Sequence, residues 1–145
     1  MAFNPDIVVT ESGSSHVLLI VEAKTNAPSS QSESELKRYM WEMSCPTGLF
    51  VSPRHIVLYR NVFTGYSDDS VKKLGEFVSP QSWRAFERRK SGIEFETRVQ
   101  SWLETLKRDG KEPDLPQETR EALSEYVVPS LMNGEIHAAG PRLAS

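Results

Sequence analysis

The sequence predicts an α/β domain of the α+β type, in which helices flank a mixed β-sheet and the C-terminal half is helical. Two apolar, β-branched runs at 5–11 and 16–25 flank the turn sequence Ser-Gly-Ser-Ser, which is typical of a β-hairpin. A helix and two further strands, at 48–52 and 55–63, are expected next. Beyond these strands, apolar residues recur at helical spacing.

The second strand of the hairpin is expected to be central in the sheet. Its residues 17–21 are all apolar, so both of its faces are suited to burial. The helix after it should begin at Ser32, because Ser32 and Glu35 match a capping box. Its apolar residues fall on one face: Leu36, Tyr39, Met40 and Met43.

Three helices are expected in the second half of the chain. The first covers 81–90 and the last runs from Gln117 into 127–131. The strongest pattern lies between them, at 93–108, where Phe95, Val99, Trp102, Leu103 and Leu106 form one apolar stripe. The predicted organisation is therefore a core at 1–63, a helical part at 64–135 packed on the same domain, and a loose tail at 136–145.

Composition excludes several classes of protein. The chain has 145 residues and a net charge of −3, so any nucleic-acid contact must come from local basic groups. Its longest apolar run is too short to span a bilayer, and no signal peptide is visible. The single cysteine, Cys45, excludes an internal disulfide, and with three scattered histidines it forms no zinc pattern. We expect a cytoplasmic protein without membrane contact.

Three charged residues lie in the otherwise apolar hairpin: Asp6, Glu22 and Lys24. Glu22 and Lys24 share a face because they are two residues apart on a strand. Asp6 joins them, with Cβ atoms roughly 5 Å apart opposite Glu22, if a three-residue loop at 13–15 connects the strands. A two- or four-residue loop would turn Asp6 to the other face unless a β-bulge restores the register.

Two carboxylates at that separation repel each other unless a cation lies between them. Mg²⁺ suits this position, because it binds one or two carboxylates together with water and phosphate oxygens. The carbonyl of Ala23 could add a further ligand. Lys24 could orient or deprotonate a water molecule, or stabilise charge on a phosphate. These groups suffice for metal-assisted hydrolysis of a phosphodiester.

Pro5-Asp6 followed by Glu22-Ala23-Lys24 resembles the signature of the PD-(D/E)xK nuclease superfamily, which has the restriction-endonuclease-like fold. Residues 35–40 are similar to the helix that follows the catalytic strands in this superfamily, where many members carry a Gln-x-x-x-Tyr pattern and this chain has Glu35 and Tyr39. Residues 48–61 are similar to the strand pair that comes after that helix. The resemblance implies Mg²⁺-dependent cleavage of DNA or RNA, with Mn²⁺ as a substitute. Asp6 and Glu22 would be metal ligands and Lys24 the catalytic lysine.

The chain departs from the family at its start. Members usually have a helix and a strand before the Pro-Asp strand, whereas only four residues precede Pro5. We expect the helix at 93–108 to take the place of the missing helix, within the chain or across a homodimer. Glu94, Glu96 or Glu104 would then face the metal.

The chain also offers basic candidates for phosphate binding: Lys37, Arg38, Arg84 and Arg88. Each could equally belong to a solvated face. In the same way, Glu35 could serve only as a cap, Tyr39 could be a core aromatic, and Glu22 with Lys24 could be a solvated pair at a frayed strand end.

The leading functional hypothesis is a nuclease whose partner is nucleic acid, in the first place DNA. The alternative is an inactive module of the same fold that binds nucleic acid or protein in a larger assembly. A small-molecule enzyme without metal is a third hypothesis, but the sequence has neither a Gly-rich phosphate loop nor an acid/base histidine to support it.

Overall fold

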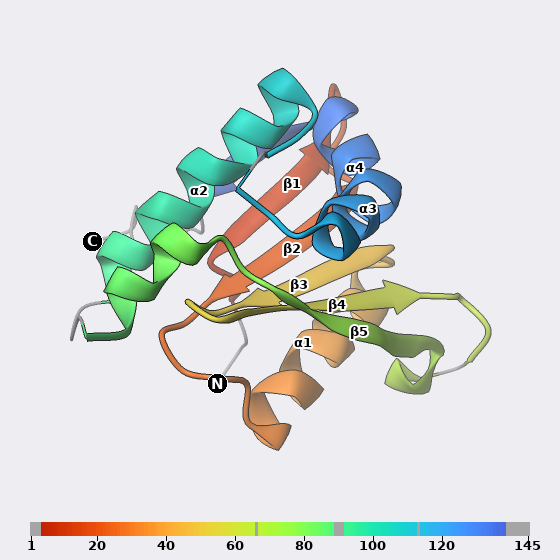
Figure 1. The fold of residues 1–145 in the computed structure, drawn as a ribbon. Helices are drawn as coiled ribbons and strands as arrows, with labels where there is room; N and C mark the ends of the chain where they lie inside the picture. The colour runs from red at the N-terminus through yellow and green to blue at the C-terminus, as the bar shows by residue number, and fades with distance from the viewer. Residues whose placement is uncertain (1–3, 66, 89–91, 113, 139–145) are drawn as a thin grey trace.

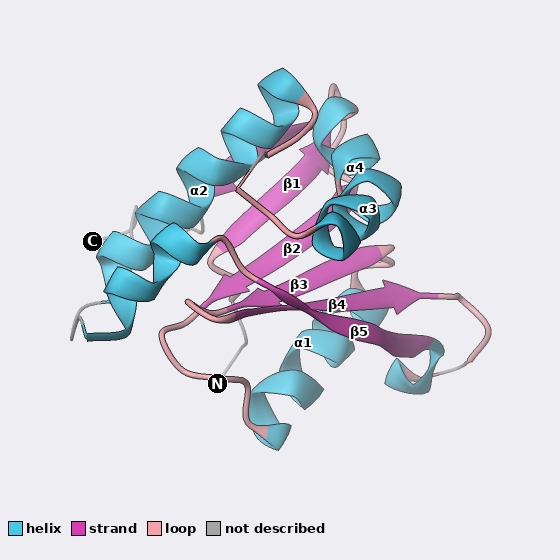
Figure 2. Ribbon diagram, viewed as in Figure 1, coloured by secondary structure: helices cyan, strands magenta, loops and turns pink. Residues whose placement is uncertain are grey.

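A six-stranded mixed sheet with helices on both faces forms the protein (Figures 1 and 2). This computed structural model describes residues 4–65, 67–88, 92–112 and 114–138. The strands follow the order β5-β4-β3-β2-β1-β6 across the sheet. Their bounds are β1 Ile7–Glu11, β2 Val17–Ala23, β3 Thr47–Val51, β4 His55–Asn61, β5 Val71–Val78 and β6 Gly134–Ala138. The predicted mixed sheet flanked by helices is confirmed.

Neighbouring strands are antiparallel except at the centre, where β2 and β3 run parallel. A parallel pair needs a crossover connection, and α1 (Ser30–Glu42) provides it. As predicted, β2 is a central strand, and its burial on both faces explains its continuous apolar run. The carboxyl ends of β2 and β3 therefore meet at the same end of the sheet as the start of β1.

One face of the sheet is covered by α1, which begins three residues earlier than the predicted capping box. Ser29 is the N-cap: its hydroxyl accepts from the Ser32 N–H at 3.1 Å, and the Ser32 hydroxyl accepts from the Ser29 N–H at 2.8 Å. The prediction of a Ser32–Glu35 box is wrong. The helix begins one turn earlier, where the hydroxyls of Ser29 and Ser32 accept from each other's backbone N–H. Met40 packs closely on β3, where a Cβ on Gly48 would lie 2.5 Å from the Met40 sulfur.

The other face is covered by α2 (Gly92–Asp109), α3 (Gln117–Tyr126), α4 (Val128–Met132) and the 3₁₀ helix η2 (Gln81–Arg88). The apolar stripe predicted at 93–108 is buried against this face. Helix α2 ends where Gly110 adopts a φ of +75° and donates its N–H to the Leu106 carbonyl. None of the helices in the described part combines the length and apolar content needed to cross a bilayer.

Trp83 and Trp102 are both buried, as expected of core residues, and their rings meet edge to face with centroids 4.9 Å apart. The predicted helix at 81–90 is 3₁₀ rather than α over the residues described, 81–88. The predicted last helix is two helices. It breaks because Pro129 has no N–H with which to continue the α3 ladder.

Two strands were not predicted, so the sheet is not confined to 1–63. β5 lies within the segment expected to be helical, and β6 extends through residue 138, into the predicted tail. Both are edge strands. Most of β5 is exposed and carries Lys72 and Lys73, so its apolar alternation is weak, which suits an edge. The rest of the predicted tail lies outside the described residues.

Candidate active site

A β-bulge sets the register of the hairpin that carries Asp6 and Glu22. The Glu11 N–H donates to the His16 carbonyl at 2.8 Å, so the connecting loop has four residues, 12–15. Thr10 pairs with Val17 but Val9 pairs with Leu19, which leaves Leu18 as the bulged residue. The three-residue loop is therefore wrong, and the alternative, an even loop corrected by a bulge, is confirmed.

The bulge brings three side chains together, and we call Asp6, Glu22 and Lys24 the carboxylate site. The Asp6 N–H donates to Glu22 Oε1 at 2.8 Å, and the Ala23 N–H donates to Asp6 Oδ2 at 2.8 Å. The Lys24 Nζ lies 3.1 Å from Asp6 Oδ2 and 3.8 Å from Glu22 Oε2. The predicted convergence of these residues is confirmed.

The two acids are buried, whereas the amine reaches solvent. Asp6 is 7% exposed and Glu22 5%, while the Lys24 side chain is 48% exposed. Strand alternation places Glu22 and Lys24 on the face of Ile20, which belongs to the core beneath α1. The site therefore lies on the α1 face of the sheet, at the end of the central parallel strand pair. It is not a solvated pair at a frayed strand end.

Burial and the negative charge of Asp6 raise the pKa of Glu22 from its ordinary value of 4.5 to about 8, although Lys24 acts in the opposite direction. Burial alone would lower the pKa of Lys24. The negative charges of Glu22 and Asp6, with a smaller contribution from Glu96, outweigh burial, so the pKa of Lys24 is raised overall. One ammonium group therefore does not compensate two buried carboxylates.

The donor set fits a hard divalent cation. Two carboxylate side chains adjoin each other at this site, and Mg²⁺ takes oxygen ligands of this kind while retaining water. Within the described ranges, no three His, Cys, Asp or Glu side chains are grouped in a way that could hold a metal. Asp6 and Glu22 would therefore be completed by other oxygens. Ala23 uses its N–H on Asp6, and its carbonyl as a ligand stays a prediction.

Helix α2 runs along the strands of the site but covers the opposite face of the sheet from the Glu22 and Lys24 side chains, so its role as a replacement for the missing helix stays a prediction. Its Phe95 packs in the same core as Ile7 and Val21, and Figure 1 shows α2 running alongside β1 and β2. Of the three acids predicted on α2, Glu96 is close enough to raise the pKa of Lys24. Glu94 is exposed, and Glu104 lies about 12 Å further along the helix axis.

The two α1 residues predicted to support the site have different surroundings. In the described part of the chain, no hydrogen bond or ion pair joins Glu35 to the carboxylate site. Tyr39 is half-buried against the core under α1, and burial raises its pKa. Glu33 makes the contact that the sequence did not reveal, since it accepts a hydrogen bond from the buried Tyr59 hydroxyl. Strand alternation on β4 was the only signal that could have placed Tyr59 beneath α1.

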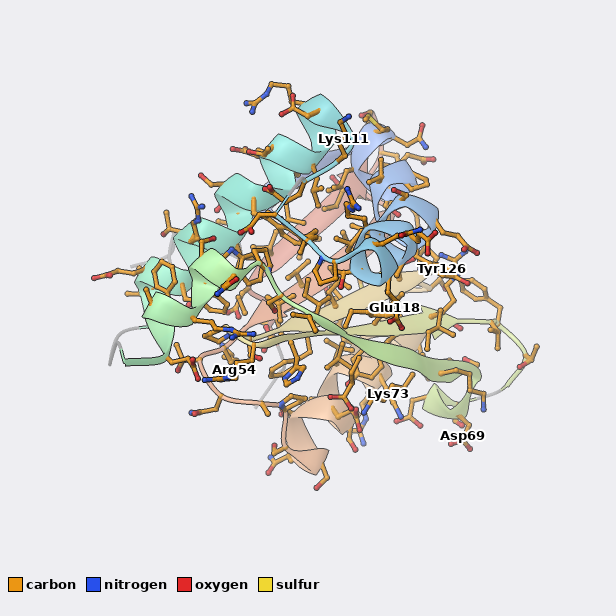
Figure 3. The ribbon with its side chains drawn as sticks, in the orientation of Figure 1. Arg54, Asp69, Lys73, Lys111, Glu118 and Tyr126 are labelled. Carbon is orange, nitrogen blue, oxygen red and sulfur yellow. The ribbon has the colours of Figure 1, made fainter. Side chains whose placement is uncertain are left out.

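The predicted phosphate-binding residues do not form one patch. Lys37 lines a cavity of about 300 Å³ with Lys72 and Lys73, near Asp69, beside α1 (Figure 3). Arg38 is exposed on the same helix. Arg84 is exposed on η2, which packs on the other face of the sheet, and the Arg88 side chain lies outside the described residues.

The other nucleophile and acid/base candidates are absent from the site. Cys45 is buried, and burial raises the pKa of its thiol to about 12, so it stays protonated at neutral pH. His16 and His55 are exposed, and the His16 Nε2 lies 3.3 Å from the Ser44 carbonyl.

No family model, curated protein or solved structure matches this chain.

Proposed function

We propose that this chain is a metal-dependent nuclease domain that hydrolyses phosphodiester bonds of DNA or RNA, in the manner of the PD-(D/E)xK nucleases it resembles. One observation carries the proposal. A bulge places Asp6 opposite Glu22, so that two buried acids and one half-exposed amine converge at the end of the central strands.

The alternative of a purely structural ion pair is disfavoured by the balance of charges. A buried ion pair seldom stabilises a fold more than well-packed apolar residues would. Here a second acid adds repulsion, because Asp6 and burial both disfavour the charged form of Glu22. Groups held at such a cost are frequent at functional sites, so we assign this cluster a functional role.

The three residues have distinct roles in the proposed reaction. Asp6 and Glu22 would hold Mg²⁺ or Mn²⁺, which when bound lowers the pKa of water and offsets charge on the phosphate. The hydrogen bond from the Ala23 N–H fixes the orientation of the Asp6 carboxylate. Lys24 reaches solvent while it contacts both acids, so it can orient a water molecule or stabilise charge that develops on the phosphate.

Lys24→Ala tests this proposal on single-stranded, double-stranded and branched substrates, with Mg²⁺ or Mn²⁺. We expect cleavage to be lost while the circular-dichroism spectrum is unchanged, because Lys24 is half exposed and outside the core. Lys111→Ala is the matched control, since Lys111 is exposed beyond the far end of α2 (Figure 3). Equal cleavage by the Lys24 variant and the wild type would contradict the mechanism.

An inactive module of the same architecture is the second candidate. It is favoured by the site having only two grouped acids among the described residues and by the net charge of −3. Calorimetric titration with Mn²⁺ separates the two functions. Binding that is lost in both Asp6→Asn and Glu22→Gln supports the nuclease, whereas no binding by the wild type supports the module.

A further inference from the structure

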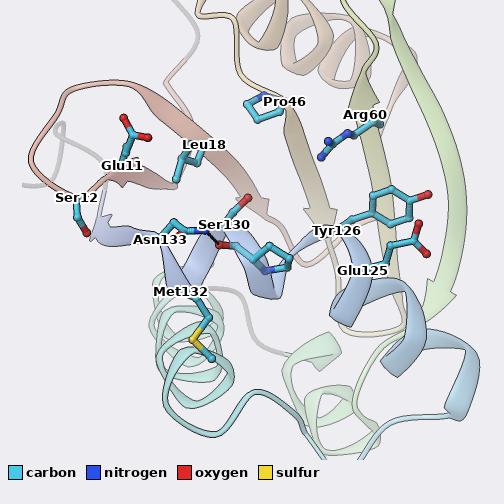
Figure 4. Close-up of a pocket in the computed structure, with 11 residues that line it drawn as sticks. Glu11, Ser12, Leu18, Pro46, Arg60, Glu125, Tyr126, Ser130, Met132 and Asn133 are labelled. Carbon is cyan, nitrogen blue, oxygen red and sulfur yellow. Dashed lines mark hydrogen bonds between the residues drawn. The ribbon is translucent and has the colours of Figure 1, made fainter.

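A second candidate site lies at the opposite end of the sheet from the carboxylate site. A cavity of about 600 Å³ opens where β2 and β3 begin and β4 ends, under α3 and α4 (Figure 4). Its walls include Leu18, Pro46, Arg60, Tyr126 and Pro129, and we call it the Arg60 cavity. This volume is typical of pockets that hold small organic ligands.

Arg60 is fixed in position by two neighbours. Its Nη1 donates to the Thr47 hydroxyl at 2.7 Å, and Thr47 is fully buried. Its guanidinium carbon lies 5.8 Å from the centroid of the Tyr126 ring, in a cation–π arrangement. A guanidinium held by a buried hydroxyl and an aromatic face loses little further freedom on binding a ligand.

The positive charge of Arg60 is not matched by an acid of the protein. No ion pair joins Arg60 to a carboxylate within the ranges that the structure describes. Its one hydrogen bond goes to a neutral hydroxyl, so most of its five donors are left for other acceptors. Figure 4 shows the guanidinium pointing into the cavity.

Two acids line the same cavity but do not neutralise Arg60. The Tyr126 hydroxyl donates to the Glu125 carboxylate, which raises the pKa of Tyr126, and Figure 4 shows both groups pointing away from the cavity. Glu11 is exposed on the far side, next to the hairpin turn. The centre of the cavity is therefore positive and its rim is negative.

We propose that the Arg60 cavity binds a small oxyanion ligand, a carboxylate or a phosphate monoester, that carries a planar apolar body. The oxyanion would be held by the fork-like donors of Arg60, which match its geometry. The apolar body would lie against Leu18, Pro46 and Pro129. This site shares no residue with the carboxylate site and is independent of the nuclease proposal.

Calorimetry with phenyl phosphate, benzoate and inorganic phosphate tests the proposal on the full chain. We expect phenyl phosphate or benzoate to bind more tightly than inorganic phosphate, and the tighter of the two identifies the oxyanion. Arg60→Gln should weaken this binding at least about tenfold, because a charged hydrogen bond is lost. Arg54→Gln is the control, since Arg54 is exposed and pairs with Glu87, and its affinity should equal that of the wild type.

Two results would overturn the proposal: no saturable binding of any probe by the wild type, or equal affinity in Arg60→Gln. If Arg60→Gln does not fold, the wild type itself gives the answer by NMR. Phenyl phosphate or benzoate should then shift the Arg60 Nε–H and Tyr126 ring resonances. Shifts at other residues without these two would contradict the assignment.

Discussion

Two buried polar clusters lie at opposite ends of this sheet, and they differ in how well their groups are matched. At one end, Asn61 is 3% exposed and accepts hydrogen bonds from two neighbours. Its Oδ1 accepts from the Ser70 hydroxyl at 3.0 Å and from the Phe63 N–H at 2.9 Å. Its Nδ2 donates to the Met40 carbonyl at 3.5 Å. All these groups are neutral, and each donor meets an acceptor.

The carboxylate site at the other end is also hydrogen-bonded, but it sets two acids against one amine. Asp6 and Glu22 are held side by side with one amine between them, and the pKa of Glu22 rises to about 8 in consequence. We therefore expect the first cluster to stabilise the fold and the second to lower its stability. This contrast is the physical reason to assign function to the carboxylate site.

The largest effect on stability should come from breaking the matched cluster. Asn61→Ala leaves the Ser70 hydroxyl and the Phe63 N–H without their acceptor, and Phe63 already has a φ of +56°. We expect the free energy of unfolding to fall by about 2–4 kcal/mol. Denaturant unfolding measures this loss. The exposed Asn133→Ala provides the comparison, and an equal loss in both would contradict the account.

The opposite change is expected at the carboxylate site. At pH 7 folding leaves Glu22 largely protonated, which costs free energy relative to the ionised carboxylate of the unfolded chain. Glu22→Gln removes this cost and keeps an oxygen that can accept from the Asp6 N–H. We expect it to raise the free energy of unfolding at pH 7 by about 1–3 kcal/mol. A destabilised variant would show that the site stabilises the fold after all.

The raised pKa of Glu22 also predicts that the free energy of unfolding depends on pH. Because the pKa of Glu22 is raised from 4.5 to about 8 on folding, the folded state binds more protons than the unfolded state between these values. The free energy of unfolding should therefore decrease as the pH rises from about 4.5 to about 8, and then level off. Glu22→Gln should lose this component, which denaturant unfolding at a series of pH values would measure in both proteins.

A smaller effect, on cleavage, is expected from substitutions in α2. Glu96 contributes to the raised pKa of Lys24 from a distance, after Glu22 and Asp6. Glu96→Gln should therefore reduce cleavage only a few-fold, and Glu104→Gln should leave it unchanged. A complete loss in Glu96→Gln would make Glu96 a third metal ligand, and an equal effect of the two substitutions would exclude a role for α2.

The features that sequence reasoning could predict are those with a local signal in the sequence. Apolar, β-branched runs around a Ser-Gly turn marked the hairpin and i, i+4 spacing marked α2, so the strand pair and its acids could be placed together. The bulge at Leu18 depends on how β1 and β2 pair, and the sequence left it as one of several registers. Edge strand β6 was missed because its partner, β1, lies at the far end of the chain.

The Arg60 cavity could not be predicted from the sequence either, because it is formed by residues far apart along the chain. Arg60 lies on β4, Thr47 on β3 and Tyr126 on α3, and no motif links these positions. Only the packing of α3 and α4 over the sheet brings them together. The N-cap of α1 was placed wrongly for a simpler reason. Both Ser29–Ser32 and Ser32–Glu35 have residue types that can form a capping box, and the structure has the earlier pair.

The most direct test of the central claim is the thermal unfolding midpoint with and without Mn²⁺. A cation that binds only the folded state raises the midpoint, and ionised carboxylates are needed to hold it. We predict a rise for the wild type that is larger at pH 9 than at pH 6, and none for Glu22→Gln. An equal rise in both proteins would contradict the assignment of Asp6 and Glu22 as a metal site.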